Sequence, residues 1–308
     1  MPFIVPLCVA AGVLFPEQIS VVKPSVPTLF AFMTFQGSLN NTVGQLLEVF
    51  RKPLPLICVL VTTLVFMPLL AFALASLIFP DNINIVAGIV LAYSVPVGIV
   101  SFMWIGMFSG NGPLGLAAIL VSTVISPISI PLTLQVLLGA TIHVDVMGMF
   151  VDMVFMIALP ALAGMLVNDL THGWGRSKLS PATAPLSKIL LTIVITSNAT
   201  GASPYVLSMN AERAMAMLFV ALFTTSGFVW GIIVGRVLRS SREDAITLAF
   251  DCGLRNISSG TVIATQYFPG EVVFPVMCGT LFQQMLAAFI GKIVGRVVEA
   301  REKKHARA

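Results

Sequence analysis

The stretch AITLAFDCGLRNISSGTVIATQYF, residues 245–268, is apolar enough to cross a membrane, yet it carries Asp251 and Arg255 near its middle. A charged side chain at the centre of a bilayer costs roughly 2.5–3.5 kcal/mol, so such residues are rare and are usually functional. If the stretch forms one continuous helix, a spacing of four residues places both side chains on one face, close enough to pair. The stretch therefore predicts a buried charged site within a membrane-spanning segment.

The composition of the whole chain points to the same surroundings. Of 308 residues, 57% are apolar and only 10% are charged, against about 25% charged residues in a soluble domain. We therefore expect an all-α polytopic membrane protein whose partner is the lipid bilayer. The basic residues lie between apolar runs and form no single patch, which argues against a nucleic-acid partner. The four cysteines have no metal-binding spacing, so we expect no cofactor.

Ten apolar segments follow one another along the chain, each near the ~20 residues that cross a bilayer. We place them at residues 1–16, 25–41, 54–79, 83–108, 112–139, 146–169, 184–207, 211–237, 244–268 and 271–296. The first has no charged lead-in and is followed by more membrane segments. We therefore interpret it as a span and not as a signal peptide, and we expect residues upstream of Met1 to complete it.

The basic residues predict how these spans are oriented. If the N-terminus is cytoplasmic, fourteen Lys and Arg residues fall in cytoplasmic regions and only Lys23 and Arg213 fall in external loops. An excess of this kind on one side is typical of cytoplasmic loops. We therefore expect a multi-pass protein of the inner (plasma) membrane with both termini in the cytoplasm.

Ten spans divide into two halves of five, residues 1–143 and 144–308, which enter the bilayer in opposite directions. Such inverted repeats are common in transporters. A shift of 155 residues sets the fourth segment against the ninth, with Gly98 on Gly253. Pro96 removes a backbone hydrogen bond in the first of these segments, and Ser258–Gly260 is a poor helix former in the second. Helix breaks persist in membranes where they line a polar cavity, so two facing breaks predict a binding site at the midplane.

Three motifs carry a resemblance to a known family. YSVPVGIVSFMWIGMFSGNGPLGLAAILVSTVISPISIPL (93–132), with STVISP at Ser122–Pro127, resembles the fourth and fifth helices of the bile acid:sodium symporter family. DCGLRNISSG (251–260) resembles that family's ninth-helix motif, E-x-G-x-Q-N-S-G. GSLNNTVGQLLEVFRKP (37–53) resembles the stretch that joins its second and third helices. The resemblance runs almost from end to end.

The resemblance implies both a fold and an activity. The fold is ten transmembrane helices in two inverted five-helix repeats. A panel domain of helices 1, 2, 6 and 7 packs beside a core domain of helices 3–5 and 8–10, in which the discontinuous helices 4 and 9 cross at the midplane. The activity is secondary active transport of a small organic anion by alternating access, driven by sodium.

The family's ligands for its second sodium are only partly matched. Its ninth-helix glutamate, which serves both sodium sites, falls at Asp251, so Asp251 is the metal ligand if any sodium site is retained. The glutamine that ligates the second sodium falls at Arg255, and a helix-three glutamine falls at Thr63. A guanidinium at this place repels sodium and can substitute for its charge.

The first sodium site departs further from the family pattern. The family's Ser-Asn pair in helix four becomes Ser101–Phe102, and its helix-five hydroxyls fall at Gly115 and Ile119. Phe, Gly and Ile have no side-chain oxygen for a sodium ion. We therefore expect conventional coupling to two sodium ions to be lost, which leaves protons as the other candidate.

Two roles stay open for the charged residues. Asp251 and Arg255 form a structural ion pair, or they form a functional site in which Arg255 binds a substrate carboxylate or replaces sodium. The further candidate site residues are polar or helix-breaking and lie in mid-segment: Asn256, Ser101, Pro96, Thr63, Asn198 and Gln283.

Other functions are weighed against transport of an organic anion. A proton-coupled carrier or exporter of related fold is the main alternative. An intramembrane protease is remote, because no membrane histidine and no GxGD motif is present in the sequence. A receptor that does not transport is equally remote, because nothing in the chain resembles a sensory output domain.

Overall fold

The computed structural model describes residues 4–48, 53–142 and 144–305, and every regular element in these ranges is a helix. In chain order the α-helices are α1 (Ile4–Leu14), α2 (Pro16–Ser20), α3 (Val26–Ser38), α4 (Val43–Glu48), α5 (Pro53–Val61), α6 (Met67–Ile78), α7 (Ile83–Ser94), α8 (Val100–Met107), α9 (Gly112–Leu138), α10 (Val146–Met153), α11 (Leu159–Leu170), α12 (Ser180–Ala199), α13 (Ser203–Leu207), α14 (Ala211–Val237), α15 (Arg242–Gly253), α16 (Ile257–Tyr267) and α17 (Gly270–His305). The start of the first predicted span and the basic residues Arg51 and Lys52 lie outside the described residues.

Short turns of other helix types join several of these elements. The 3-10 turns are η1 (Lys23–Ser25) and η6 (Thr200–Ala202), and the π-helical turns are η3 (Thr62–Phe66), η4 (Val154–Ala158) and η5 (Gly175–Leu179). The turns η3 and η4 each lie inside a longer rod, so that α5–η3–α6 and α10–η4–α11 are continuous helices.

The protein is a polytopic membrane protein. Among the described residues, six continuous helices are long and apolar enough to cross a membrane: Pro53–Ile78, Gly112–Leu138, Val146–Leu170, Gly175–Leu207, Ala211–Val237 and Gly270–Gly291. A seventh is counted if the pair Pro6–Leu14 and Pro16–Ser38, bent by 101°, forms one span. The fourth and ninth predicted segments are each two short helices around a break, so the count of ten spans stays a prediction.

Most predicted segments match a helix within a few residues. The tenth, predicted to end at residue 296, has a helix that ends at His305. The seventh, predicted to begin at residue 184, has a helix that begins at Gly175. Its first turns hold GRSKLSPATAP, which is too polar for the apolar window that defined the segment. Backbone hydrogen bonding continues the helix beyond the apolar part.

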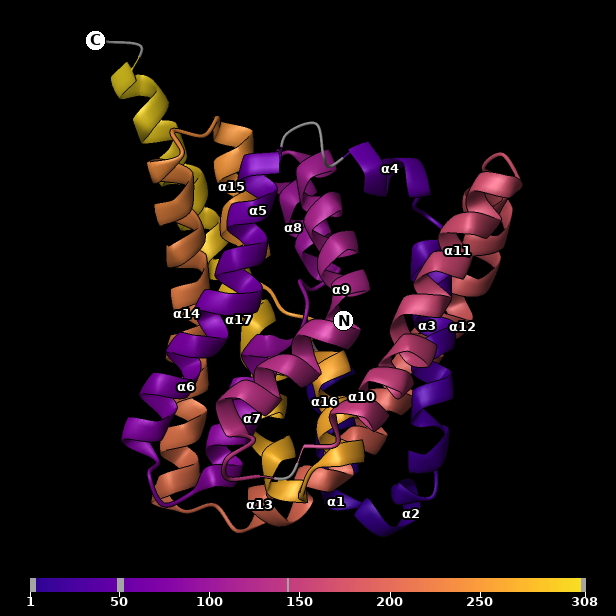
Figure 1. Cartoon of the computed structure of the whole chain (residues 1–308), viewed down its shortest axis with the longest axis vertical. Coiled ribbons are helices and arrows are strands. Elements are labelled where there is room, and N and C mark those ends of the chain that lie inside the picture. The colour runs from indigo at the N-terminus through magenta and orange to yellow at the C-terminus, as the bar shows by residue number, and fades with distance from the viewer. Residues whose placement is uncertain (1–3, 49–52, 143, 306–308) are drawn as a thin grey trace.

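The helices form two groups that lie side by side (Figure 1). In one group α3 packs against both α11 and α12, and α12 also packs against α1. In the other, α14 packs against α15 and α17, and α7 packs against α6 and α17. Large apolar side chains such as Leu77 and Leu222 are exposed on the outside of these helices. In a bilayer such side chains face lipid tails, so helix association depends on close packing.

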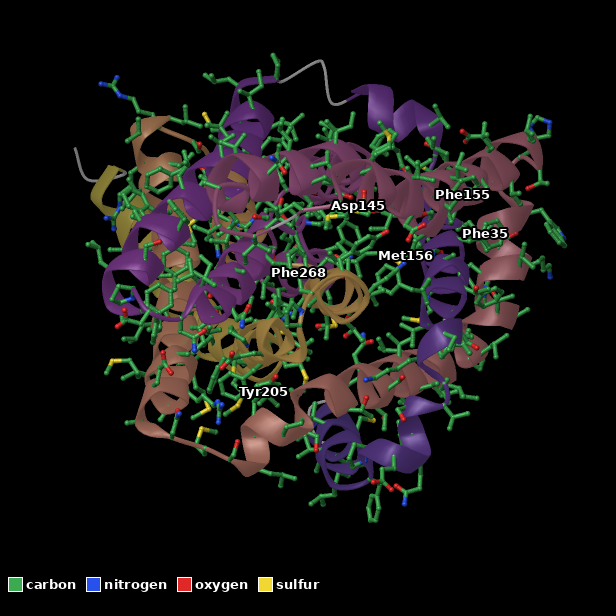
Figure 2. All side chains as sticks on the ribbon, turned by 60° about the horizontal axis from the view of Figure 1, so that its bottom comes forward. Phe35, Asp145, Phe155, Met156, Tyr205 and Phe268 are labelled. Atoms are coloured by element: carbon green, nitrogen blue, oxygen red, sulfur yellow. The ribbon has the colours of Figure 1, made fainter. Side chains whose placement is uncertain are left out.

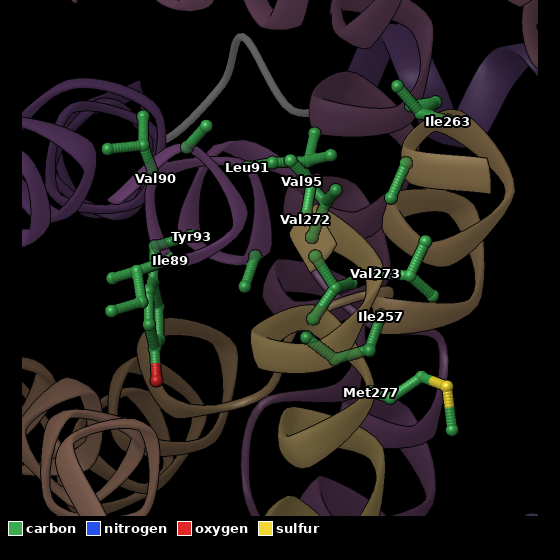
Figure 3. Packing of buried hydrophobic residues seen from close by; sticks show 14 of the residues in the cluster. Ile89, Val90, Leu91, Tyr93, Val95, Ile257, Ile263, Val272, Val273 and Met277 are labelled. Carbon is green, nitrogen blue, oxygen red and sulfur yellow. The ribbon is translucent and has the colours of Figure 1, made fainter. Parts of the chain in front are cut away.

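The second group is built around α7, which is buried on every side from Ile85 to Ser94. Figure 3 shows the apolar side chains of α7 against those of α16 and α17. Their backbones also come close, since a Cβ atom on Gly88 would lie 2.4 Å from the carbonyl oxygen of Val272. Such contact between small residues is a common means of joining helices in a membrane.

A row of glycines holds α15 against α14. Gly227, Gly231 and Gly235 recur every four residues on one face of α14. A Cβ atom on Gly231 would lie 2.2 Å from the carbonyl oxygen of Leu248, and one on Gly227 would lie 2.6 Å from that of Cys252. The backbone of α15, which carries Asp251, is therefore fixed by direct contact with its neighbour.

Polar side chains of α10 and α16 join the two groups. Asp152 of α10 accepts hydrogen bonds from Gln266 and Tyr267, at the end of α16. Within the first group, η4 follows α10 and packs against α3. Figure 2 shows Phe155 of η4 near Phe35 of α3. The carboxylate of Asp152 therefore links a helix of the first group to one of the second.

Candidate functional site

The fourth predicted segment is broken at Pro96. The helix α7 ends at Ser94, and Val95 is extended, with φ −69° and ψ 154°. A residue before proline is pushed out of the helical region by the proline ring, and proline has no N–H to continue the ladder. The second half of the segment, α8, begins at Val100.

The ninth segment is also broken, between Gly253 and Ile257, and the expectation that Ser258–Gly260 breaks it is wrong because these residues are helical. The helix α15 ends at Gly253, and Leu254 is extended, with φ −111° and ψ 125°. The chain re-enters a helix at Ile257, where Asn256 acts as N-cap: its Oδ1 accepts a hydrogen bond of 3.4 Å from the N–H of Ser259. A side-chain cap of this kind satisfies a backbone donor that the helix itself cannot.

The two breaks cross and satisfy each other's backbones. Gly98 N–H donates to Leu254 O at 3.0 Å, and Asn256 N–H donates to Pro96 O at 2.9 Å. Val97 and Arg255 thereby form an isolated antiparallel β-bridge. The crossing requires glycine at position 98, because a Cβ atom there would lie 2.7 Å from Arg255 O. Unwound backbone at this depth is tolerated because its polar groups are paired.

Side chains from neighbouring helices bond the remaining N–H groups of the crossing. Val97 N–H donates to Ser122 Oγ of α9 at 3.1 Å, and Arg255 N–H donates to Gln283 Oε1 of α17 at 3.3 Å. Sequence reasoning did not assign a role to Ser122. It is the first residue of STVISP, and the presence of that motif was the only signal that pointed to it.

Asp251 is fully buried beside this crossing, in the last turn of α15. Its Oδ1 accepts a hydrogen bond of 2.7 Å from Ser101 Oγ, in the first turn of α8. Its Oδ2 has no hydrogen-bond partner among the described residues. One oxygen of a buried carboxylate is therefore available to another group.

Arg255 is also buried, with 3% of its surface exposed, and it points toward α5 and α6. Its Nη1 donates to the carbonyl oxygen of Thr63 at 3.1 Å, whereas its Nη2 has no partner in the described part of the chain. A guanidinium carries a full positive charge and five N–H donors. A cation with free donor capacity thus lies in the interior.

The π-helical turn η3 explains why Thr63 has a free carbonyl. Met67 donates its N–H to Thr62 across the wider turn, so this N–H is not available to Thr63. The residue five positions after Thr63 is Pro68, which has no N–H. The carbonyl oxygen of Thr63 therefore has no partner in its own helix and accepts from Arg255. Such π turns are frequent at functional sites.

The expectation that Asp251 and Arg255 pair on one helical face is wrong. No ion pair joins them among the described residues. The reason is that α15 ends at Gly253 and Leu254 is extended, so the helical spacing of four residues does not apply. Asp251 bonds to α8 and Arg255 bonds to the η3 turn.

The side chains around Asp251 do not supply the oxygen ligands of a sodium ion. Phe102, at the family's asparagine position, is 44% exposed and has no oxygen. Gly115 and Ile119 also have none, and Ile119 packs in an apolar cluster. Beyond Asp251 itself, Ser101 offers the one hydroxyl bonded to this carboxylate in the described residues. The residues present therefore do not fit the first sodium site of the family.

A small cavity with both apolar and polar lining residues lies between the two helix groups. Its volume is about 10 Å³, room for roughly one water molecule. It is lined by Val9, Val194, Ile195, Asn198, Ser258, Thr261, Met277 and Thr280. Asn198 is 2% exposed, and its Oδ1 has no partner among the described residues. Sequence reasoning singled out Asn198 but not Ser258, Thr261 or Thr280, whose hydroxyls are common in apolar helices and carry no signal alone.

The structure brings most of the predicted site residues together at the crossing. Hydrogen bonds link Asp251 with Ser101, Arg255 with Thr63 and Gln283, and Asn256 with Pro96. Asn198 is the exception, since it lines the cavity between α1, α12, α16 and α17. The predicted residues therefore form one connected centre and one separate group.

Known proteins resemble this chain over most of its length. Residues 27–209 match the model of the sodium bile acid symporter family. YbaS of Bacillus subtilis, named an uncharacterized protein, is 37% identical over 296 residues, which cover 96% of this chain and 97% of YbaS. YocS of Bacillus subtilis, named an uncharacterized sodium-dependent transporter, is 24% identical and covers 94% of this chain and 89% of its own. BASS1 of Arabidopsis thaliana, named a probable chloroplastic sodium/metabolite cotransporter, is 26% identical over 90% of this chain and 68% of its own.

These matches confirm the family that the three motifs predicted. They also decide between the broad classes of function, since the family is one of membrane transporters and not of enzymes. The chain belongs to the sodium bile acid symporter family.

Proposed function

We propose that this protein is a secondary active transporter that moves a small organic anion by alternating access. The observation that carries the proposal is the crossing of the two broken helices, with Asp251 and Arg255 buried beside it and each only partly hydrogen-bonded. Intramembrane charges at broken helices are typical of transport sites for ions and substrates.

An anion suits the charges at the crossing. The helices α8 and α16 both begin there, and the N-terminus of a helix carries a partial positive charge. Arg255 adds a full positive charge with an unpartnered Nη2. At the start of α8, the N-cap residue Ile99 and Phe102 are 55% and 44% exposed, so this N-terminus lies near the surface of the helix groups. A carboxylate could approach it without displacing the buried part of the crossing.

The architecture we propose is ten spans in two inverted repeats, residues 1–143 and 144–308. The protein would lie in the inner (plasma) membrane, with both termini in the cytoplasm. Support comes from the equivalent breaks at Pro96–Ile99 and Leu254–Asn256 and from the distribution of basic residues. The panel would consist of α1, α3, α10–α11 and α12, and the core would contain the crossing. The contacts of α3 with α11 and α12 support this division.

The positive charge of Arg255 takes the place of the family's second sodium ion in this proposal. Its Nη1 binds the carbonyl oxygen of Thr63 at 3.1 Å, and carbonyl oxygens are ligands that sodium would otherwise use. A cation fixed to the protein supplies the charge without entering from solution. The direct consequence is a transport cycle that moves one cation fewer than in sodium-coupled relatives.

Changing Arg255 to glutamine tests this substitution. The variant removes the fixed cation and restores the residue that the resemblance implies, so we expect uptake to become dependent on sodium. Uptake should be measured in proteoliposomes with sodium gradients from zero to 100 mM at constant ionic strength. Arg255→Lys is the matched control, because it keeps the charge and should stay independent of sodium. An Arg255→Gln variant with normal transport and no response to sodium would contradict the role of Arg255.

The cavity at Asn198 is a candidate contact for the substrate. Its lining residues come from both helix groups, so it would widen when the groups separate during alternating access. The proposed substrate is an organic anion of unspecified structure. Short keto acids and hydroxy acids, including vitamin precursors, are candidate substrates beside a bile acid.

We expect Asn198→Leu to weaken substrate binding at least about tenfold, the effect of losing a net ~1.4 kcal/mol from a buried hydrogen bond. The measurement is the rise in melting temperature of the purified protein with each of a panel of organic acids, taurocholate included. Thr192→Val, on the same helix but outside the cavity, should bind as the parent does. Equal ligand stabilisation in both variants would remove Asn198 from the site.

A proton-coupled carrier or exporter is the second candidate function. The observation that favours it is the free Oδ2 of Asp251 in surroundings that lack further oxygen ligands. Uptake into liposomes under separately imposed sodium and pH gradients distinguishes the coupling ions. Uptake that strictly requires sodium would contradict this alternative, and accumulation driven by a pH gradient alone would support it.

A further inference from the structure

A methyl group of Ile105 fills the space beside Asp251 where a ligand from α9 would lie. A Cβ atom on Gly115 would be 2.4 Å from Ile105 Cδ1 and 3.5 Å from Asp251 Oδ2. A side chain at position 115 would therefore begin beside the free carboxylate oxygen, in the volume that Ile105 occupies. With Ile105 in this position, residue 115 has no room for a side chain that would reach Asp251.

The packing around Ile105 holds its side chain in place. Ile105 is fully buried in an apolar cluster with Phe228, Phe250 and Leu254. From another side, a Cβ atom on Gly110 would lie 2.9 Å from Ile105 Cγ2. A side chain confined by aromatic rings and backbone cannot move aside without leaving a cavity. The methyl group beside Asp251 is thus a fixed feature of the site.

Thr247 does not supply the missing oxygen. Its Oγ1 donates to two backbone carbonyls, Asn111 O at 3.1 Å and Glu243 O at 3.0 Å. Its methyl carbon Cγ2 lies 3.3 Å from the Cβ position of Gly115. The free oxygen of Asp251 therefore has methyl groups, and not hydroxyls, on the side facing α9.

We propose that Ile105 determines the ion selectivity of this transporter by excluding sodium from Asp251. The inference rests on the proposed role of Asp251 as the coupling carboxylate. A sodium ion gives up its hydration shell only where several oxygens replace it, because an unsolvated charge in an apolar interior is strongly unfavourable. Ile105 removes both the space and the position from which the missing oxygen would come.

The test is to reopen the site and to measure sodium binding directly. Ile105→Ala removes the obstructing methyl groups. Gly115→Ser adds a hydroxyl on a Cβ atom that would lie 3.5 Å from Asp251 Oδ2. We expect the double variant to gain about 3 °C or more in melting temperature with 100 mM sodium, against an equal concentration of choline, because a ligand that binds only the folded state stabilises it. The unaltered protein should melt at the same temperature in both salts.

Three matched variants separate the contributions. Gly115→Ala adds the Cβ atom without an oxygen and should not respond to sodium. Ile105→Ala alone adds space without an oxygen and should respond weakly. The double variant with Asp251→Asn should lose the response. If Ile105→Ala destabilises the protein too far, Ile105→Val with Gly115→Ser removes a single methyl group and serves the same comparison.

Two results would overturn the inference. One is a sodium-specific rise in melting temperature of the unaltered protein that disappears in Asp251→Asn. The other is a folded double variant that does not respond to sodium. Neither measurement needs transport. If the protein takes up no organic anion, the proposed function is contradicted. The melting temperatures would still show whether sodium binds at Asp251.

Discussion

Uptake by the Asp251→Asn variant is expected to fall to the level of empty liposomes, while the amount of protein inserted in the membrane is unchanged. Asparagine has nearly the same shape as aspartate and still accepts the hydrogen bond from Ser101, so the fold should survive. The variant loses the negative charge and the second carboxylate oxygen, Oδ2, which has no partner among the described residues. Initial rates of substrate uptake in proteoliposomes measure the effect.

Glu17→Gln is the control for this loss of charge. Glu17 is an exposed carboxylate at the start of α2, so its variant should transport at the rate of the unaltered protein. Size-exclusion chromatography and the melting temperature establish that both variants are folded. Normal uptake by a folded Asp251→Asn variant would remove Asp251 from the mechanism and return the residue to a structural role.

Gly98→Ala should separate the two broken helices and stop transport through a loss of structure. The added Cβ atom would lie 2.7 Å from Arg255 O and 2.9 Å from its carbonyl carbon, and backbone atoms cannot rotate away as a flexible side chain can. Overpacking of this kind typically costs about 1–3 kcal/mol. We expect a melting temperature lower by roughly 2–12 °C, since about 1 kcal/mol corresponds to 2–4 °C in a chain of a few hundred residues.

Gly106 provides a matched control within the same broken span. It lies in α8, and a Cβ atom there would have no heavy atom within 4 Å. Gly106→Ala should leave the melting temperature unchanged or raise it slightly, because alanine reduces the freedom of the unfolded chain. If the two alanine variants have the same melting temperature, the close contact at Gly98 does not stabilise the crossing.

The sequence was sufficient to predict the position of the first break, because that break follows from local chemistry. Pro96 cannot donate a backbone hydrogen bond, and it restricts Val95, so one break is fixed by two adjacent residues. The second break was predicted in the right segment but at the wrong residues, since Ser258–Gly260 are helical and the break lies at Leu254–Asn256. The match of Gly98 with Gly253 indicated the segment, although the two glycines have different neighbours. A Cβ atom on Gly98 would meet Arg255 O, whereas one on Gly253 would meet the ring of Phe228.

The partners of the charged residues could not be predicted in the same way. The spacing of Asp251 and Arg255 indicates a pair only if the helix continues between them, and it ends at Gly253. Arg255 instead binds a backbone carbonyl, which carries no sequence signal of its own. That carbonyl is free because η3 is a π turn followed by Pro68. The position of Ile105 likewise depends on how α8 packs against α9 and α15.

The crossing has a consequence for how the chain is made. Pro96 O and Gly98 N–H are paired with Asn256 and Leu254, which the ribosome adds more than 150 residues later. The first half of the protein therefore enters the bilayer with an unwound segment whose polar groups await their partners, a costly state in lipid. Nascent chains that end before residue 254 should depend on insertion factors or water to shelter this segment. The two halves complete their fold together.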